Sequence, residues 1–493
     1  MKTNLFRIVI LLLPAAIFAN AADSFGFGAK GTGMSGVGTA MVNDWTAPYF
    51  NIAGLAFPDP DTARLRKRKE NADDSASGKI RILKTKEEQL QEVDEEGDYE
   101  TEVGFNYLYQ ISSMTISPVS TNSQVENNIG IATEGANFGF IQLGLVFDLR
   151  NWFFIPQRLP VKFGIAMSLR DNGNIAAVND VSAESYNFLR LNRESQRIMI
   201  MSGLGFQVWK DRLSFGAGTS ILAGGDGRFR MDNVIIDPSG NEQIPAQEVI
   251  LNLTPRIAPT AGVQYRHALK DLISAPWAAQ GTLYTGISWR GELYMELDPL
   301  VASATTQLLA IDLPIRLSVL EFYTPHIFSW GLGYMHSDWL KAELDLEMQL
   351  WSGYKLSSAK ITYYARQNIS IPEFENIFVP RFGAAIRPGE FISAMAEVPL
   401  WTRFGYALVP AFTPDQAGVT NFLDNTKHLI SLGAGYTLPA NKVVKVPVEL
   451  NLGLQMQLWG SRESSKAAVN SFNPSYSYSA SIFIVSLSAS MKF

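Results

Sequence analysis

The chain alternates hydrophobic and polar positions with a period of two in many segments between Val103 and its C-terminus. The clearest segment runs from Leu340 to Tyr354, where Lys341, Glu343 and Asp345 share one face and apolar side chains occupy the other. A helix would spread these charges around its circumference, whereas a strand places them all on one side. The pattern therefore predicts β-strands with one wet face and one apolar face.

Strand length indicates where such strands would lie. The alternating segments 250–265, 285–298 and 448–459 each extend over about 10 residues or more, the length that crosses a bilayer at a tilt. A soluble β-sandwich alternates in the same way but usually has shorter strands. We expect strands to start near Val103, Phe138, Val161, Arg197, Leu213, Ile250, Gln280, Thr324, Leu340, Phe378, Phe391, His428, Pro447 and Tyr476.

The connections between these strands alternate in length. Tight turns are expected at 211–212, 337–338 and 388–390, and long irregular connections at 171–194, 355–377 and 407–427. Short turns at the periplasmic end and long loops at the outer end are typical of an outer-membrane barrel. The fold class predicted is all-β, a transmembrane antiparallel β-barrel.

The first 21 residues have the pattern of a secretory signal peptide. Lys2 and Arg7 form a positive region, an apolar run from Ile8 to Phe18 follows, and Ala19-Asn20-Ala21 is an A-x-A cleavage site. We expect cleavage after about Ala21, export, and residence in the bacterial outer membrane.

A glycine-rich stretch follows this signal, and its Gly31-Thr32-Gly33-Met34-Ser35-Gly36 matches the G-x-G-x-x-G of dinucleotide-binding loops. That loop needs a buried strand before it, which cleavage after Ala21 would not leave. Small residues also suit a segment that bends sharply and passes close to a barrel wall. The match is therefore interpreted as a coincidence of composition.

Residues 58–102 differ from the rest of the chain, because they are dense in charge and nearly lack apolar side chains. Such composition indicates a solvated insertion, disordered or partly helical.

Composition excludes several classes of function. The chain has 493 residues, a net charge of −6 and no cysteine, so a disulfide framework, a thiolate metal site and a nucleic-acid partner are not expected. Its four histidines are scattered without an H-E-x-x-H motif, and no G-x-S-x-G motif occurs. We expect no enzymatic activity, no metal and no cofactor.

Three regions resemble the FadL-type outer-membrane transporters of long-chain fatty acids and other hydrophobic compounds. Residues 24–56 are similar to the family's N-terminal hatch, with Asn51-Ile52-Ala53 in place of its Asn-Pro-Ala box. Residues 379–438 resemble its late strands, and 161–178 its third strand and the interruption of that strand.

This resemblance implies a barrel of about 14 strands, compatible with the strand starts above. Residues 1–21 would be the signal peptide, 22–57 a hatch that plugs the lumen, 58–102 the insertion and 103–493 the barrel. The implied function is uptake of hydrophobic small molecules, long-chain fatty acids or aromatic hydrocarbons. Ligand would be captured outside, the hatch would move, and the ligand would leave sideways through a kinked third strand.

The resemblance also implies site residues. Phe25 and Phe27 would line an apolar pocket, and Arg381 and Arg403, both on inward-facing positions, would meet a ligand carboxylate. For each arginine, an ion pair with an inward-facing acid is the alternative. Asp171, Asn172 and Gly173 would form the kink; an ordinary strand-to-loop transition is equally compatible with them.

The expected partners are a hydrophobic ligand, outer-membrane lipid and the barrel-assembly machinery. The machinery is expected because the terminal aromatic Phe493, at the end of an alternating strand, resembles the signal by which bacterial barrels are handed to it. We expect a monomer. The alternative function is that of a non-transporting barrel of the same superfamily, a scaffold or shuttle in protein secretion. A lipase or protease barrel would need a Ser and a His on neighbouring strands at the membrane edge. It has little support, because His267 falls in an expected periplasmic turn and His428 at an outer strand start.

Overall fold

A computed structural model describes residues 22–57, 101–119, 137–151, 160–170, 199–209, 212–222, 225–231, 234–235, 243–244, 247–253, 256–306, 311–337, 339–354, 372–396, 398–417, 422–440, 444, 446–466 and 475–493. The predicted signal peptide, nearly all of the charged insertion and the predicted kink at 171–173 lie outside these residues. Among the described residues, no helix is long and apolar enough to cross a membrane.

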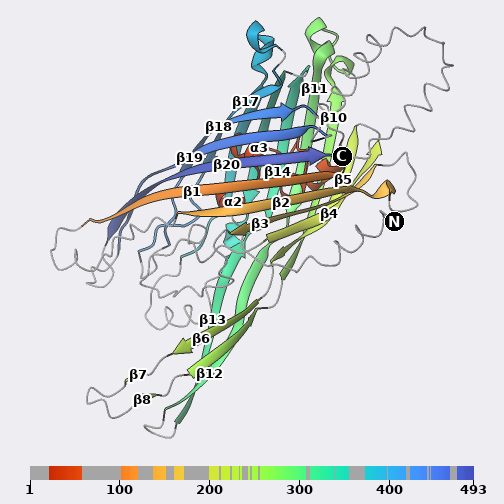
Figure 1. Cartoon of the computed structure of the whole chain (residues 1–493). Helices are drawn as coiled ribbons and strands as arrows, with labels where there is room; N and C mark the ends of the chain where they lie inside the picture. Colours follow the sequence, from red (N-terminus) through yellow and green to blue (C-terminus); the bar gives the residue numbers. More distant parts are fainter. Residues whose placement is uncertain are drawn as a thin grey trace, which may run out of the picture.

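Fourteen antiparallel strands close into a barrel, which confirms the predicted fold class (Figure 1). The first and last strands pair over 17 residues, and the ladder closes with reciprocal backbone hydrogen bonds between Thr101 and Phe493. In barrel order the strands are β1 (Glu102–Pro118), β2 (Phe138–Asp148), β3 (Val161–Arg170), β4 (Met199–Trp209), β5 (Leu213–Leu222), β10 (Arg256–Ala268), β11 (Gly281–Arg290), β14 (Ile327–His336), β15 (Leu340–Gln349), β16 (Ile377–Ile386), β17 (Leu400–Val409), β18 (Lys427–Leu438), β19 (Val448–Ser464) and β20 (Tyr476–Lys492).

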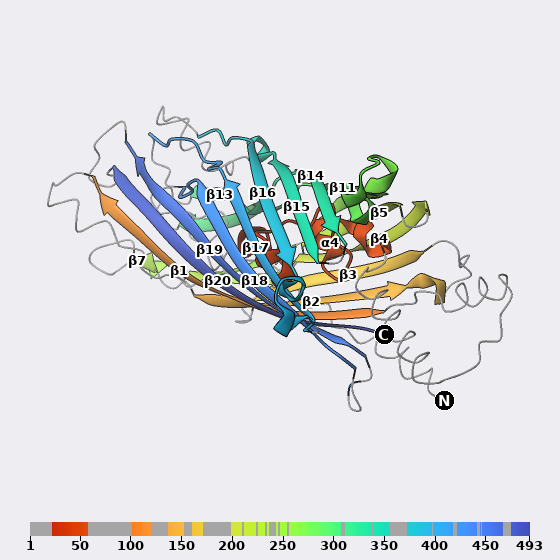
Figure 2. The ribbon, with the colours of Figure 1, turned by 90° about the horizontal axis from the view of Figure 1, so that it is seen from above.

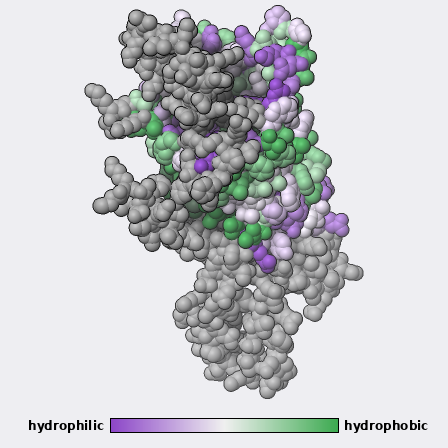
Figure 3. All heavy atoms as spheres, turned by 90° about the vertical axis from the view of Figure 1, so that its right-hand side faces the viewer, coloured by the Kyte–Doolittle hydropathy of each residue, from purple (hydrophilic) through white to green (hydrophobic). Residues whose placement is uncertain are grey.

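The two faces of the strands follow the predicted alternation. In β15, Glu343 and Asp345 are buried inside the barrel, whereas Leu344 and Leu346 are 46% and 42% exposed on its outer surface. Leucines, phenylalanines and isoleucines are exposed on the outer faces of most other strands too, and Figure 3 shows part of this apolar surface in green. Such a surface is typical of a barrel that spans a bilayer, where lipid tails cover the apolar side chains of the outer face.

Three strand predictions were wrong. The segment 250–265 is divided between β9 (Gln247–Leu253) and β10, and the segment 285–298 between β11 and β12 (Leu293–Thr306). The second break falls at Gly291, whose N–H donates to the Pro259 carbonyl in register with the β10–β11 pairing, so that this bond is the end of that ladder. The strand expected near Phe391 begins at Leu400, because 388–396 form a turn with two short 3₁₀ helices, η7 (Pro388–Glu390) and η8 (Ser393–Met395).

The remaining strands lie outside the barrel sheet. β12 pairs with β13 (Ile311–Thr324), β6 (Gly225–Met231) pairs with β9, and β7 (Val234–Ile235) pairs with β8 (Gln243–Ile244). Figure 1 shows these hairpins extending away from the barrel. Short 3₁₀ helices η2 (Leu149–Asn151), η4 (Leu269–Asp271) and η5 (Pro276–Gln280) occupy turns at the opposite end.

Residues 22–57, called here the N-terminal segment, lie within the ring of strands (Figures 1 and 2). The segment contains single-turn helices α2 (Ala22–Phe25), α3 (Ala29–Thr32) and α4 (Ala47–Phe50), and the 3₁₀ helix η1 (Ile52–Ala56). Most of its side chains are buried, and its polar backbone groups bond to side chains that point inward from the wall.

Glycines of the wall make room for this segment. A Cβ added to Gly104 would lie 2.3 Å from the indole of Trp45, and one added to Gly405 would lie 2.3 Å from the backbone carbon of Met34. Every barrel strand except β15 and β20 has such a glycine against the N-terminal segment. These glycines are Gly104, Gly144, Gly164, Gly203, Gly205, Gly216, Gly218, Gly262, Gly286, Gly331, Gly333, Gly383, Gly405, Gly433 and Gly453.

Candidate functional site

The Asn51-Ile52-Ala53 motif fixes the N-terminal segment to the wall. The amide of Asn51 donates to three carbonyls, those of Thr39 at 2.7 Å, Val263 at 3.1 Å and Ile287 at 3.3 Å. Its carbonyl oxygen accepts from the Ala53 N–H at 3.2 Å and so caps η1. The 3₁₀ helix η1 forms although Ile52 stands at the position of the proline in the Asn-Pro-Ala box. Asn51 connects this helix to β10 and β11 through its hydrogen bonds to Val263 and Ile287.

Two carboxylates of β15 hold the middle of the segment. The same oxygen of Asp345, Oδ2, accepts from the N–H groups of Gly38 and Thr39, both at 3.0 Å. Glu343 Oε1 accepts from the N–H groups of Ala40 at 2.6 Å and Met41 at 3.2 Å. Four consecutive backbone donors therefore end on two wall carboxylates that are buried from solvent.

The first residues of the segment make a different set of contacts. Asp23 pairs with Arg290 at 2.9 Å and accepts from the Tyr49 hydroxyl at 3.0 Å, and the Arg290 guanidinium lies over the Tyr49 ring. The amide of Gln142 bonds to the Gly26 carbonyl at 2.9 Å and the Gly28 N–H at 2.8 Å. Burial and the Asp23 charge raise the pKa of the Tyr49 phenol above its usual range, so the hydroxyl stays a donor.

Lys30 connects the segment to itself and to β19. Its ammonium lies 3.1 Å from Asp44 and 2.8 Å from Glu449. Burial opposes ionisation of Asp44, but the charge of Lys30 and hydrogen bonds from Thr46 outweigh it, so the Asp44 pKa lies below its usual value.

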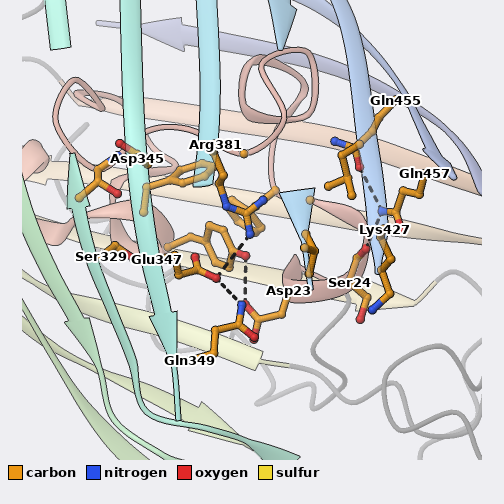
Figure 4. Close-up of a pocket in the computed structure, with 18 of the residues that line it drawn as sticks. Asp23, Ser24, Ser329, Asp345, Glu347, Gln349, Arg381, Lys427, Gln455 and Gln457 are labelled. Carbon is orange, nitrogen blue, oxygen red and sulfur yellow. Dashed lines mark hydrogen bonds and ion pairs between the residues drawn. The ribbon is translucent and has the colours of Figure 1, made fainter. Parts of the chain in front are cut away.

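A cavity of about 70 Å³ lies between the first residues of the segment and the wall. Figure 4 shows Glu347 and Arg381 on one side of it, Lys427, Gln455 and Gln457 on the other, and Asp23 and Ser24 between them. Charged and amide side chains make up about half of this lining, and Phe27, Tyr49, Phe50, Val409 and Leu429 contribute apolar surface. The cavity therefore suits a polar group or water and is too small for the body of a large apolar molecule.

The four residues predicted to bind ligand lie at different places: two line this cavity and two do not. Phe27 and Arg381 line the cavity. Arg381 donates to the Ser35 carbonyl at 3.1 Å and pairs with Glu347 at 3.4 Å. Phe25 packs against Phe138 and Phe140 outside the cavity lining, and Arg403 lies 3.9 Å from Glu449 at another level of the lumen.

An apolar cluster lies beside this cavity at the outer end of the barrel, against β16, β17 and β18. The rings of Trp351 and Phe412 stack with centroids 3.9 Å apart and planes 10° from parallel. Phe374 and Phe422 pack edge to face beside them, and all four side chains are at most 5% exposed. The outer aromatic cluster is Trp351, Phe374, Ile377, Val379, Ala407, Val409, Phe412, Phe422 and Leu429. Val409 and Leu429 also line the cavity, so the two sites are continuous.

The β17–β18 connection carries Phe412 and Phe422, and two basic side chains hold it in place through hydrogen bonds to its backbone carbonyls. Arg462 donates to the carbonyls of Asp424 at 3.0 Å and Thr413 at 2.9 Å, and Lys466 to that of Gln416 at 2.9 Å. Burial lowers the pKa of the Lys466 ammonium to about 8.

Sequence reasoning missed the residues of the outer aromatic cluster and the cavity cation Lys427. The signal available was the aromatic content of the connections: Phe374, Phe412 and Phe422 fall in segments that were interpreted as loops, and Trp351 lies near the end of the strand segment 340–354. Among the described residues, no group of three or more His, Asp or Glu side chains could hold a metal ion.

These features define a class: a closed antiparallel barrel with an apolar outer face and its own N-terminal segment in the lumen, a bacterial outer-membrane protein. The fold is that of a FadL-type barrel. A FadL homologue from Pseudomonas aeruginosa superposes with a TM-score of 0.52 at 14% identity, over 94% of this chain and 98% of that one. The P. putida toluene transporter TodX gives a TM-score of 0.48 at 13% identity, over 95% and 99%. No family model and no curated protein matches the sequence.

Proposed function

We propose that the protein is an outer-membrane channel for the uptake of hydrophobic small molecules. The observation that carries the proposal is the buried outer aromatic cluster, which puts an apolar surface inside the lumen at the outer end. A general porin has a polar, water-filled lumen and needs no such surface. The fold shared with a FadL homologue is compatible with this function.

The route has two layers in series. An apolar molecule first enters among the outer aromatic side chains, where it replaces one ring contact with another at little cost. It then reaches the polar cavity, whose far wall is the N-terminal segment. Passage requires the segment to act as a hatch and move, after export and cleavage of the signal peptide. Release would then occur sideways next to the end of β3, at the kink predicted from the sequence for 171–173.

Labelled uptake in a deletion strain tests this function. A long-chain fatty acid and an alkylbenzene are supplied separately to cells with and without the gene, and to the deletion strain carrying it on a plasmid. We expect uptake of one of them to fall in the deletion strain and to return with the plasmid. Unchanged uptake, together with loss of secreted proteins from the surface, would overturn the transport function in favour of a role in protein secretion.

A further inference from the structure

Two turns at the periplasmic end share a sequence and a backbone conformation. Residues 271–275 of the β10–β11 turn, Asp-Leu-Ile-Ser-Ala, match residues 390–394 of the β16–β17 turn, Glu-Phe-Ile-Ser-Ala, and Ile-Ser-Ala occurs nowhere else in the sequence. In each turn the N–H groups of the two apolar residues donate to one carbonyl, that of Leu269 or of Pro388, at 3.0 and 2.9 Å in both cases. The same local geometry therefore presents an apolar pair twice.

Both apolar pairs are exposed. Leu272 is 62% and Ile273 41% exposed in the first turn, and Phe391 is 68% and Ile392 49% exposed in the second. They lie beyond the strands, since β10 ends at residue 268 and β16 at residue 386. Figure 1 shows the two turns, in green and blue, extending past the strand ends on the same side. Single exposed apolar side chains are common, but a pair repeated at one rim indicates a contact surface.

A belt of ring side chains lies directly below these turns, on the outward face of the barrel. Tyr265 and His267 end β10, Tyr334 and His336 end β14, and each tyrosine hydroxyl lies 2.8 Å from the Nδ1 of its histidine. Trp339 follows on the β14–β15 turn. Tyrosine and tryptophan gather where a membrane meets water, because the ring is apolar and its tip is polar. The belt therefore marks the headgroup level of the inner leaflet.

Both turns pack against this belt. The Phe391 ring meets the Trp339 ring edge to face, with centroids 5.2 Å apart. In the other turn, a Cβ added to Gly281 would lie 3.0 Å from the Leu269 side chain and 3.1 Å from the Tyr334 ring, so η4 starts beside that tyrosine. The apolar pairs are thus continuous with the outer surface that the bilayer covers.

Backbone hydrogen bonds join the two turns through the short turn between them. The Ser337 N–H donates to the Gln280 carbonyl at 2.7 Å, and the Arg387 N–H to the Trp339 carbonyl at 2.8 Å. The two turns are four strand spacings apart in the barrel order, about 19 Å at about 4.8 Å each. One flat membrane surface can therefore meet both at once.

The charges beside the first pair also suit phospholipid headgroups. Lys270 is exposed, and the Arg212 guanidinium lies 5.0 Å from the Trp209 ring centroid and 3.4 Å from Asp271. Basic side chains beside apolar and aromatic ones are typical of interfacial anchors, because their stems lie on apolar surface while the charge reaches lipid phosphate. The second turn has no excess of positive charge, so apolar burial is what the two turns share.

We infer that residues 269–275 and 388–394 are two membrane anchors, whose apolar pairs enter the inner leaflet of the outer membrane at the headgroup level. The partner is the phospholipid of that leaflet. Contact with lipid removes from water the four side chains that the protein alone leaves exposed. This contact is independent of what the barrel transports.

The chain has no cysteine, so single cysteines can report the surroundings of chosen side chains. L272C and F391C are labelled with a small fluorophore and placed in phosphatidylcholine vesicles whose lipid carries a nitroxide quencher, either near the headgroup or deep in the acyl chain. Both leaflets contain the quencher, so the direction of insertion does not matter. L432C, at an outer-face side chain 60% exposed in β18, is the control for the hydrocarbon core. D415C, at a side chain 92% exposed in the β17–β18 connection, is the control for water.

We expect lipid nitroxide to quench both anchor labels about threefold or more beyond the D415C label, and the shallow quencher to act more strongly than the deep one. The L432C label should show the opposite order of depth. Iodide dissolved in the water should quench the D415C label more than either anchor label.

Each variant is checked for a closed barrel by its migration on an unheated gel, and I273C or I392C replaces a variant that does not fold. Iodide quenching of both anchor labels as strong as at D415C, without nitroxide quenching, would overturn the inference and favour a soluble partner for these turns. Nitroxide quenching at only one of the two turns would overturn it as well, because the repeat would then not have a common role.

Discussion

The lumen contains two buried groups of residues at different levels, called here the inner and the outer closure, and the two are built in different ways. The inner closure, the N-terminal segment, bonds through its own backbone to side chains of the wall, such as Glu343, Asp345 and Gln142. The outer closure packs aromatic side chains against one another, and Trp351 and Phe412 are its centre. Hydrogen bonds fix position, because each donor needs its acceptor at a set distance. Apolar packing has no such requirement, so another apolar body can replace it.

In the channel proposed above, this difference would let apolar molecules pass while water and polar solutes are excluded. The outer closure would select by chemistry, since apolar molecules would intercalate among its rings. The inner closure would select by geometry, since it would stay shut until specific hydrogen bonds break. Each of the following changes weakens one closure and should leave the other intact.

Removal of the Trp45 side chain should have the largest effect, on the inner closure alone. The indole is 3% exposed and fills the space above Gly104 and Gly144. We expect Trp45→Ala to destabilise the seating of the N-terminal segment by about 3–5 kcal/mol, seen as faster amide exchange throughout 26–57. Trp209→Ala, at a side chain 52% exposed, is the control that should change nothing there. Unchanged exchange in Trp45→Ala would show that the segment is seated without this contact.

Removal of the Phe412 ring should weaken the outer closure by a similar or smaller amount. Its ring is 3% exposed and stacks on Trp351. Phe412→Ala should cost about 3–4 kcal/mol in thermal unfolding and increase exchange in residues 410–426, while residues 38–57 keep their protection. The control is Phe378→Ala, at a side chain 55% exposed on the outer surface. Loss of protection in 38–57 would show that the two closures are coupled.

Replacement of Asn51 should have an intermediate effect on the inner closure. Asn51→Ala removes three donated hydrogen bonds and the cap of η1, at a cost of about 1–3 kcal/mol. Asn51→Asp should be more damaging, because it places a negative carboxylate against three carbonyl oxygens. Leak of a small polar antibiotic into cells reports both variants. A smaller leak in Asn51→Asp than in Asn51→Ala would contradict the assigned hydrogen bonds.

The smallest effect is a pH dependence of the outer closure through Lys466. Burial lowers its pKa to about 8, below the ordinary value of 10.5. Between these two pH values the closed loop binds fewer protons than an opened one, so raising the pH through this window stabilises closure. The melting temperature of the unmodified protein relative to Lys466→Met should therefore increase from pH 8 to pH 10. A difference that falls over this range would contradict the burial of the ammonium.

The barrel could be predicted from sequence because strand alternation reports directly which face is wet. The segment around Glu343 and Asp345 is an example, and both residues face inward as expected. Alternation does not report which sheet a strand joins. The break at Gly291 was therefore missed, since residues 285–298 continue to alternate across it. The start of β17 at Leu400 was missed because residues 391–396 are mostly apolar although they form a turn.

The site was harder to predict, because alternation shows whether a side chain faces the lumen but not at which level along the barrel axis it lies. Arg381 and Arg403 both point into the lumen, but Arg403 pairs across the ladder with Ala385, four residues from Arg381. At about 3.3 Å per residue this separates them by about 13 Å. Only Arg381 reaches the cavity. The outer aromatic cluster was missed for another reason, since loop residues that fold back into a lumen leave no periodic pattern.

The wall glycines have a consequence for substrate preference. At the level of the N-terminal segment, strands such as β1, β5 and β17 present backbone rather than side chains to the lumen. A molecule passing there would touch the side chains of the segment itself, such as Phe27 and Tyr49. Beside the inward-facing side chains of the wall, such as Arg381 and Gln455, residues 23–57 would then contribute much of the chemistry of the passage. Barrels of this fold could thus acquire new substrates by changing one short stretch of sequence, with the fourteen strands left as they are.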